Sequence, residues 1–179
     1  ASTPDAANLS LSTGLDLAAE VSIDWRRESG NQILIGKWET AGDQRSYMLR
    51  VFFNPNDNHK IALTWTSAGT AATTGTFFFN VSFPPERFAV RMTMDTTSGI
   101  VNFYTAPHLG DPWTLRGSAD AGGPFTIFDG TAPLRVAPNG QENIPPRNPF
   151  IGKGHRFQVR NGVGGAIVAN PDFTVQTPG

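Results

Sequence analysis

A polar turn joins two apolar runs within residues 32–53, and this pattern limits the fold more than any other stretch of the chain. Residues 33–38 form a short apolar run, and residues 46–53 place side chains alternately on two sides. A period of two is typical of a β-strand. The intervening segment, residues 39–45, contains the turn former Gly42 and no apolar residue larger than alanine. The sequence therefore predicts a β-hairpin.

Most of the remaining chain repeats the same pattern of short extended segments separated by turns. Extended segments are expected at residues 18–25, 60–66, 76–83, 87–95, 100–105, 113–116, 125–128, 134–136, 156–160, 165–169 and 173–176. No segment has a convincing helical period, so we expect an all-β sandwich or barrel. A length of 179 residues favours one domain, residues 15–179, after a loose N-terminal lead-in, residues 1–14. The predicted core is Val21, Ile23, Trp25, Leu49, Val51, Leu63, Trp65, Phe88, Val90, Met92, Val101, Phe103 and Phe157.

Composition and charge exclude several classes of function. The net charge is −1, so no overall positive field favours nucleic acid. No basic amphipathic stretch suggests a helix on a membrane surface, and no apolar run reaches the roughly 18 residues of a membrane-spanning helix. The chain contains no cysteine, which excludes a disulfide scaffold and a thiolate metal site. We expect neither nucleic acid binding nor membrane insertion.

The carboxylates and histidines do not form a recognisable catalytic pattern. A glycosidase needs two facing carboxylates, and no strand carries the alternating acids that would supply them. The acids at Glu20, Glu28, Glu39, Glu86 and Glu142 are predicted to be solvated surface charges. The histidines at 59, 108 and 155 lack metal-type pairing, and no Gly-x-Ser-x-Gly elbow is present. The glycine-rich run at residues 162–165 is interpreted as a hairpin turn. We therefore expect no catalytic residues.

Three motifs, taken in order, resemble a known family of β-sandwiches. The central hairpin, residues 35–51, resembles that of laminin-G-like jelly rolls in the concanavalin A-like superfamily, and residues 98–117 resemble their next hairpin. The tail, residues 150–173, is similar to the closing strands of such domains in minor tail proteins of actinobacteriophages. The resemblance implies a two-sheet antiparallel jelly-roll sandwich. It also implies a virion tail or extracellular location, with other tail-protein domains as partners. Because a single glycan site would bind weakly and adhesion would need several copies, we expect a homo-oligomer in the full-length protein.

Calcium is the one metal that this resemblance raises. Many laminin-G-like relatives place an aspartate just after a glycine near the final strands, whereas residues 154–157 contain no acid here. Turn aspartates at 95, 111 and 129 are an alternative set of oxygen ligands for this hard cation, although such residues commonly cap their own backbone. The expectation is a domain without a cofactor, with calcium left as an alternative.

The loop after residue 103 is the strongest candidate for a binding site. Sugar recognition uses exposed aromatic faces together with polar groups that bond to hydroxyls. Tyr104, His108, Asp111 and Trp113 supply both within ten residues. The alternative is that Trp113 packs under the loop and binds nothing. The other tryptophans, at 25, 38 and 65, lie in strand patterns and are predicted to be core.

Three functions are consistent with these observations. The first is a non-enzymatic recognition module of a phage tail or surface fibre that binds host cell-surface carbohydrate. The second is a structural or decoration domain of a tail assembly without a ligand. The third is a polysaccharide-degrading enzyme whose site has no recognisable motif. The first is preferred because of the resemblance and the missing catalytic pair.

Overall fold

The computed structural model describes residues 1–11, 13–23, 30–53, 59–81, 86–137 and 150–175 of the chain. Twelve strands run through these residues, with three short 3-10 helices between them. The elements are β1 (Ser2–Thr3), η1 (Ala7–Leu9), β2 (Gly14–Ile23), β3 (Gly30–Glu39), η2 (Ala41–Asp43), β4 (Gln44–Phe53), β5 (Lys60–Thr66), η3 (Ala71–Thr73), β6 (Thr74–Asn80), β7 (Phe88–Asp95), β8 (Ile100–Ala106), β9 (Thr114–Asp120), β10 (Leu134–Val136), β11 (Gly152–Asn161) and β12 (Ala166–Ala169). Among these residues, no helix is long and apolar enough to cross a membrane.

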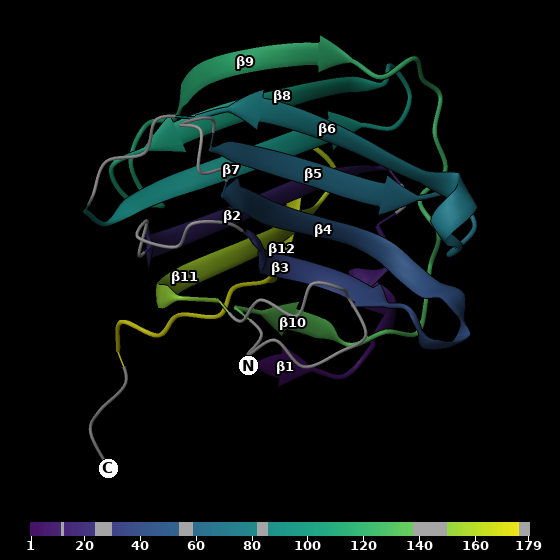
Figure 1. Ribbon diagram of the computed structural model, residues 1–179, viewed down its shortest axis with the longest axis horizontal. Helices are drawn as coiled ribbons and strands as arrows, with labels where there is room; N and C mark the ends of the chain where they lie inside the picture. The colour runs from purple at the N-terminus through teal and green to yellow at the C-terminus, as the bar shows by residue number, and fades with distance from the viewer. Residues whose placement is uncertain (12, 24–29, 54–58, 82–85, 138–149, 176–179) are drawn as a thin grey trace.

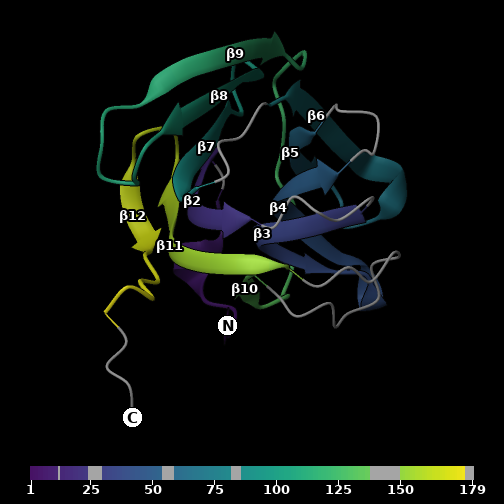
Figure 2. The same cartoon turned by 60° about the vertical axis from the view of Figure 1, so that its left-hand side comes forward.

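The strands form two layers of six strands each (Figures 1 and 2). Sheet A has the order β1-β10-β3-β4-β5-β6, and sheet B has the order β12-β11-β2-β7-β8-β9. Every pairing between these strands is antiparallel. The prediction of an all-β, two-sheet antiparallel jelly-roll sandwich is confirmed.

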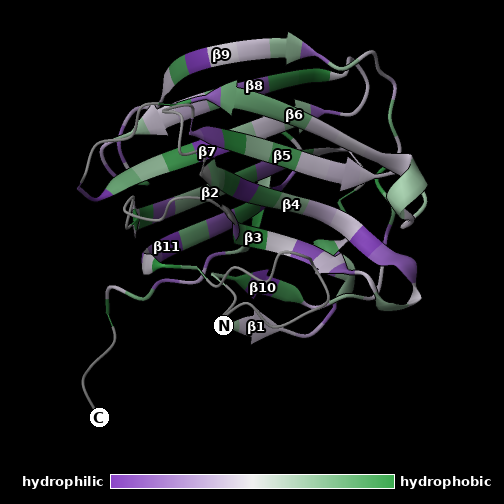
Figure 3. Ribbon diagram, in the orientation of Figure 1, coloured by the Kyte–Doolittle hydropathy of each residue, from purple (hydrophilic) through white to green (hydrophobic). Residues whose placement is uncertain are grey.

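The predicted central hairpin is the pair β3–β4, which turns through η2. Its register pairs Lys37 with Tyr47 and extends to Gly30 opposite Phe53. Most of the other predicted segments are also strands, although β6 begins earlier and β9 ends later than predicted. Hydrophobic and hydrophilic residues follow one another along the strands in Figure 3. This alternation is what lets each sheet turn one face to the core and the other outward.

The core lies between the two sheets and contains the residues that the alternation predicted. Twelve of the thirteen predicted core residues are buried in one cluster, and the thirteenth, Trp25, lies outside the described residues. Trp38 and Trp65 are also buried, as predicted. Phe77 stacks on Trp65 with ring centroids 6.1 Å apart, and Phe79 stacks on Phe103 at 5.7 Å. The aromatic residues thus fill the space where β5 and β6 face β7 and β8.

The N-terminal segment is attached to the sandwich rather than loose. Ser2–Thr3 pairs with β10, and the side chains of Leu9 and Leu11 are buried in the core. Asp5 forms an ion pair of 2.6 Å with Lys37, whose side chain has no exposed area. Because the buried ammonium group of Lys37 needs a counter-charge, its ion pair with Asp5 holds the N-terminal segment on the sandwich. The division of the chain at residue 14 stays a prediction.

Two predicted strands are wrong for physical reasons that the backbone hydrogen bonds make clear. Residues 125–128 cross from one sheet to the other: Phe125 N donates to Thr96 O beyond β7, and Phe128 N donates to Thr66 O at the end of β5. A segment bonded to two different sheets has no ladder along its length. At residues 173–176, the described part makes a turn after one isolated bridge between Arg156 and Asp172. Gln176 lies outside the described residues.

Candidate functional site

The outer face of sheet B has a shallow depression because small residues meet there on adjacent strands. Ala18 on β2, Ala89 on β7 and Ala106 at the end of β8 form a cluster separate from the main core. Leu109 is buried in this cluster, and Trp113 packs against it. The loop of residues 107–113 therefore folds back over its own sheet. The alanines leave the space that the loop fills.

A buried carboxylate fixes the start of this loop. Glu20 has no exposed side-chain area, and its Oε2 accepts a hydrogen bond of 3.1 Å from Leu109 N. Its Oε1 lies 2.5 Å from Arg87 Nε and 3.0 Å from His108 Nδ1. Burial raises the pKa of Glu20, but these three hydrogen bonds outweigh it, so the pKa lies below its usual value. The prediction that Glu20 is a solvated surface charge is wrong, because strand parity places it under the loop.

A second buried acid holds an arginine in the middle of the same face. Asp16 Oδ1 and Oδ2 accept bonds of 2.7 and 2.6 Å from Nε and Nη2 of Arg91. Such a bidentate pair fixes the plane of the guanidinium group. That group lies 5.4 Å from the ring centroid of Tyr104 and 5.8 Å from that of Trp113. Arg91 therefore has its charge compensated and its face against two aromatic rings.

An open groove of about 500 Å³ lies between the loop and strand β11. We call it the arginine groove, and its lining residues are Arg91, Leu109, Gly110, Asp111, Trp113, Arg156, Gln158, Arg160 and Gly164. The register explains its shape: Gln158 pairs with Ala18, and Ala18 pairs with Arg91. The small residue Ala18 therefore separates the longer side chains of Gln158 and Arg91, which face the groove from its two sides.

The four residues predicted to bind a ligand occupy different positions relative to this groove. Asp111 and Trp113 line it, and Trp113 is half-buried against the alanine cluster. Tyr104 points outward from β8, as predicted, and contacts Arg91 beside the groove. His108 is 55% exposed but turns its Nδ1 to Glu20. The carboxylate Oδ2 of Asp111 accepts a bond of 3.0 Å from His108 N.

The sequence analysis missed the arginines and the glutamine of the groove. Strand parity alone places Arg91 on the outer face, since Val90 and Met92 are core. The same parity in β11 puts Arg156, Gln158 and Arg160 on one face. Parity could not supply the pairing of β11 with β2, in which Gln158 lies opposite Ala18, a residue from near the other end of the chain. That pairing is what brings the two sets together.

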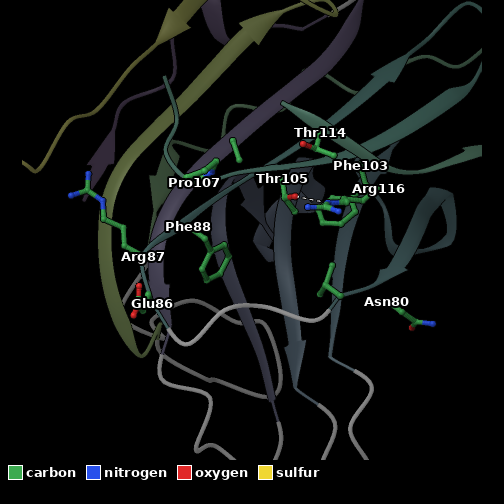
Figure 4. Close-up of a pocket in the computed structure, with 11 residues that line it drawn as sticks. Asn80, Glu86, Arg87, Phe88, Phe103, Thr105, Pro107, Thr114 and Arg116 are labelled. Carbon is green, nitrogen blue, oxygen red and sulfur yellow. Dashed lines mark hydrogen bonds between the residues drawn. The ribbon is translucent and has the colours of Figure 1, made fainter. Parts of the chain in front are cut away.

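A larger cavity of about 730 Å³ opens between the sheets near the edges of β6 and β9 (Figure 4). The rings of Phe88 and Phe103 lie in it, and Arg116 Nε donates a bond of 2.7 Å to Thr105 Oγ1 at its border. Its lining includes the residues on both sides of segment 82–85, which lies outside the described residues. The candidate site is the arginine groove, because it contains Asp111 and Trp113, two of the four residues predicted to bind a ligand.

The aspartates considered as calcium ligands form hydrogen bonds with different parts of the protein. Asp95 accepts bonds from Thr97 N and Ser98 Oγ, which makes it a turn cap. Asp129 accepts bonds from Ser10 Oγ and Lys37 Nζ. In the described part of the chain, no three or more His, Asp or Glu side chains gather in a way that could hold a metal ion. These residues do not support the alternative calcium site.

Comparison with known proteins gives similarity in structure but not in sequence. No family model and no curated protein matches the sequence. Among solved structures, the CBM40 domain of the Ruminococcus gnavus IT-sialidase bound to α2,3-sialyllactose has a TM-score of 0.62 and 13% identity, covering 88% of this chain and 80% of that one. A SAP-like pentraxin of Limulus polyphemus has a TM-score of 0.54 at 10% identity, covering 90% of this chain and 75% of that one.

A phage protein is also among the similar structures. The enzymatically active domain of tailspike protein 2 of bacteriophage CBA120 has a TM-score of 0.55 and 13% identity. The match covers 84% of this chain but only 22% of the tailspike chain. At such identities the similarity is one of fold, and these neighbours agree with the jelly-roll architecture.

Proposed function

We propose that this domain is a non-enzymatic carbohydrate-recognition module that binds glycan in the arginine groove. The observation that carries the proposal is the groove itself: an open depression with the half-buried Trp113 on one side and fixed polar side chains on the other. An aromatic face can cover the apolar side of a sugar ring while donors bond to its hydroxyls. Tyr104 contacts Arg91, which lines the groove, and His108 bonds to Glu20, which holds the loop.

The fold similarities support this class of function. One similar structure is a CBM40 domain bound to sialyllactose, and another is a phage tailspike domain. Together with the resemblance to laminin-G-like domains of phage tail proteins, they favour a module on a virion tail or another extracellular surface. Its partners there would be host cell-surface glycan and neighbouring tail-protein domains.

The two buried acids of β2 argue against a glycosidase in this groove. A strand rises about 3.3 Å per residue, so Asp16 and Glu20 are separated by about 13 Å along β2. Glycosidase carboxylates lie about 5–9.5 Å apart. Both acids are also engaged by arginine side chains, and neither is among the residues that line the groove. The module therefore binds polysaccharide without cleaving it.

Binding by one shallow open site is expected to be weak, in the range of about millimolar to micromolar, and several copies on one fibre would raise the avidity. Homo-oligomerisation of the full-length protein is part of this proposal. A single groove then needs only modest affinity for useful attachment.

The test is binding of the purified domain to an array of bacterial cell-surface glycans, with Trp113→Ala and Gln158→Ala as groove variants. Phe78→Ala is the matched control, because Phe78 is an exposed aromatic residue on sheet A. We expect both groove variants to lose binding while the control retains it, with melting of Gln158→Ala unchanged. Retained binding in both groove variants, or release of reducing ends by the wild type, would overturn the proposal.

A further inference from the structure

The two walls of the arginine groove differ in how their charges are compensated. On the β7 side, Arg91 is neutralised by the bidentate contact with Asp16. On the β11 side, Arg160 donates from Nε to Gln158 Oε1 at 2.9 Å and from Nη1 to Gly165 O at 3.0 Å. Both partners are uncharged. Among the described residues, Arg160 forms no ion pair with a carboxylate: its cross-strand neighbour Asp16 is instead bonded to Arg91 and to Gly164 N.

Arg160 also has donors to spare in a fixed geometry. A guanidinium group carries five N–H donors, and the two bonds just described leave three for another partner. Gly165 belongs to the tight β11–β12 turn, whose Gly164 N donates a bond of 2.9 Å to Asp16 Oδ2. The turn is therefore tied to β2, and the guanidinium group is held on both sides. Little side-chain freedom remains to be lost when a ligand binds.

Arg156 adds a second cation on the same wall. Its Nε is buried and donates no hydrogen bond, and it lies 3.3 Å from Asp172 Oδ2 as a loose ion pair. Arg156 and Arg160 are both on the outward face of β11, with Gln158 between them. Among the described residues that line the groove, Asp111 is the one carboxylate, and it belongs to the opposite wall. Positive charge is thus concentrated along β11 in a protein whose net charge is −1.

We propose that the arginine groove selects an acidic glycan, with an oxyanion of the sugar bound by Arg160 and Arg156 and the sugar ring placed against Trp113. This inference rests on the proposed function and names its ligand class. Guanidinium groups match the geometry of carboxylates and phosphates through paired N–H donors. A neutral sugar would leave Arg160 without an ion-pair partner, whereas an oxyanion would supply one.

The experiment measures calorimetric binding of three probes to the wild-type domain. The probes are a polygalacturonate oligosaccharide for a carboxylate, a glycerol-phosphate oligomer for a phosphate, and a neutral maltooligosaccharide. Arg160→Gln removes the charge, and Arg116→Gln is the matched control, because Arg116 lies on β9 outside the groove. We expect binding of at least one acidic probe. Arg160→Gln should weaken it about tenfold or more, while Arg116→Gln leaves it unchanged.

The dependence of binding on ionic strength is an independent test of the acidic ligand. Binding of an acidic probe should weaken between low and high salt, because partly exposed charges are screened. The wild type could instead bind the neutral probe, with binding lost in Gln158→Ala but unaffected by Arg160→Gln. That result would overturn the proposal of an acidic ligand while supporting the glycan site. Equal affinity of wild type and Arg160→Gln for an acidic probe would also overturn it. If none of the probes and no glycan on the array binds, the proposed function fails together with this inference.

Discussion

Two regions of the molecule hold cations in fixed positions, one around Lys37 inside the sandwich and one around Arg160 on the outer face of sheet B. Lys37 Nζ bonds to Asp5 at 2.6 Å and to Asp129 at 3.0 Å, and its side chain has no exposed area. Arg160 is held by a glutamine and a backbone carbonyl, beside an open groove. The first cation is buried and paired with two partly exposed acids, and the second has neutral partners and an open side.

This difference distinguishes a charge that stabilises the fold from a charge that is available to a ligand. The Lys37 cluster, formed by Lys37, Asp5 and Asp129, joins three parts of the chain that are far apart in sequence: the N-terminal segment, β3 and the segment before β10. Hydrogen bonds from Ser10 and Lys37 lower the pKa of Asp129, and burial together with the charges of Asp5 and Asp129 raises the pKa of Tyr47. Every described group there has a partner that belongs to the fold. In the arginine groove, donors remain for a ligand.

The largest expected effect comes from removing both acids of the Lys37 cluster. Asp5→Asn with Asp129→Asn leaves a buried ammonium group without a counter-charge. The free energy of unfolding should fall by about 3 kcal/mol, the lower end for an unpaired buried charge, since Asp129 is itself largely exposed and screened. Urea unfolding of the wild type and the double variant measures this difference in the free energy of unfolding.

Lys37→Met is the companion variant, because it removes the buried charge and leaves the two acids to be hydrated. It should cost less than the double variant, and neither should change glycan affinity where the domain remains folded. A loss of affinity in folded Lys37→Met would show that the two regions are not separate in the way proposed here.

An intermediate effect is expected at Glu20, which stabilises the fold and also holds the loop beside the groove. Glu20→Gln should cost about 2 kcal/mol at neutral pH, within the range for buried groups that lose a charged hydrogen bond. The folded-state pKa of Glu20 lies below the reference value of 4.5, so its stabilisation is present above that pH and is lost as the pH falls through the folded-state pKa. The difference in unfolding free energy between wild type and variant should therefore shrink in acid. A difference that stays constant from pH 7 to strongly acid conditions would contradict this account.

The hydrophobic core and the two cationic regions differ in how far the sequence predicts them. Alternation in strands such as β5 and β7 places Leu63, Val90 and Met92 inward without further information, which is why the core was predictable. Asp111 and Trp113 were found because they are neighbours in one short loop. Arg160 and Lys37 were not, because their roles depend on partners brought by strand pairing and chain crossing. Residues 125–128 illustrate the same limit: the pattern predicts a strand, but the segment connects the two sheets through bonds from Phe125 N to Thr96 O and from Phe128 N to Thr66 O.

The smallest expected effect is a gain of affinity from Asp172→Asn, which tests whether the β11 wall carries spare positive charge. Asp172 Oδ1 accepts bonds from Thr174 N and Oγ1, and an asparagine oxygen can keep both. Its Oδ2 lies 3.3 Å from Arg156 Nε, and the substitution removes that counter-charge. Because both side chains are partly exposed, the pair is weak. Its removal should tighten binding of an acidic oligosaccharide about 1.5- to 5-fold. Calorimetry should find the affinity for a neutral oligosaccharide and the melting temperature unchanged. An affinity for the acidic probe that falls, or that stays the same, would mean that Arg156 does not face the ligand, and the anion site would then be reduced to Arg160 alone.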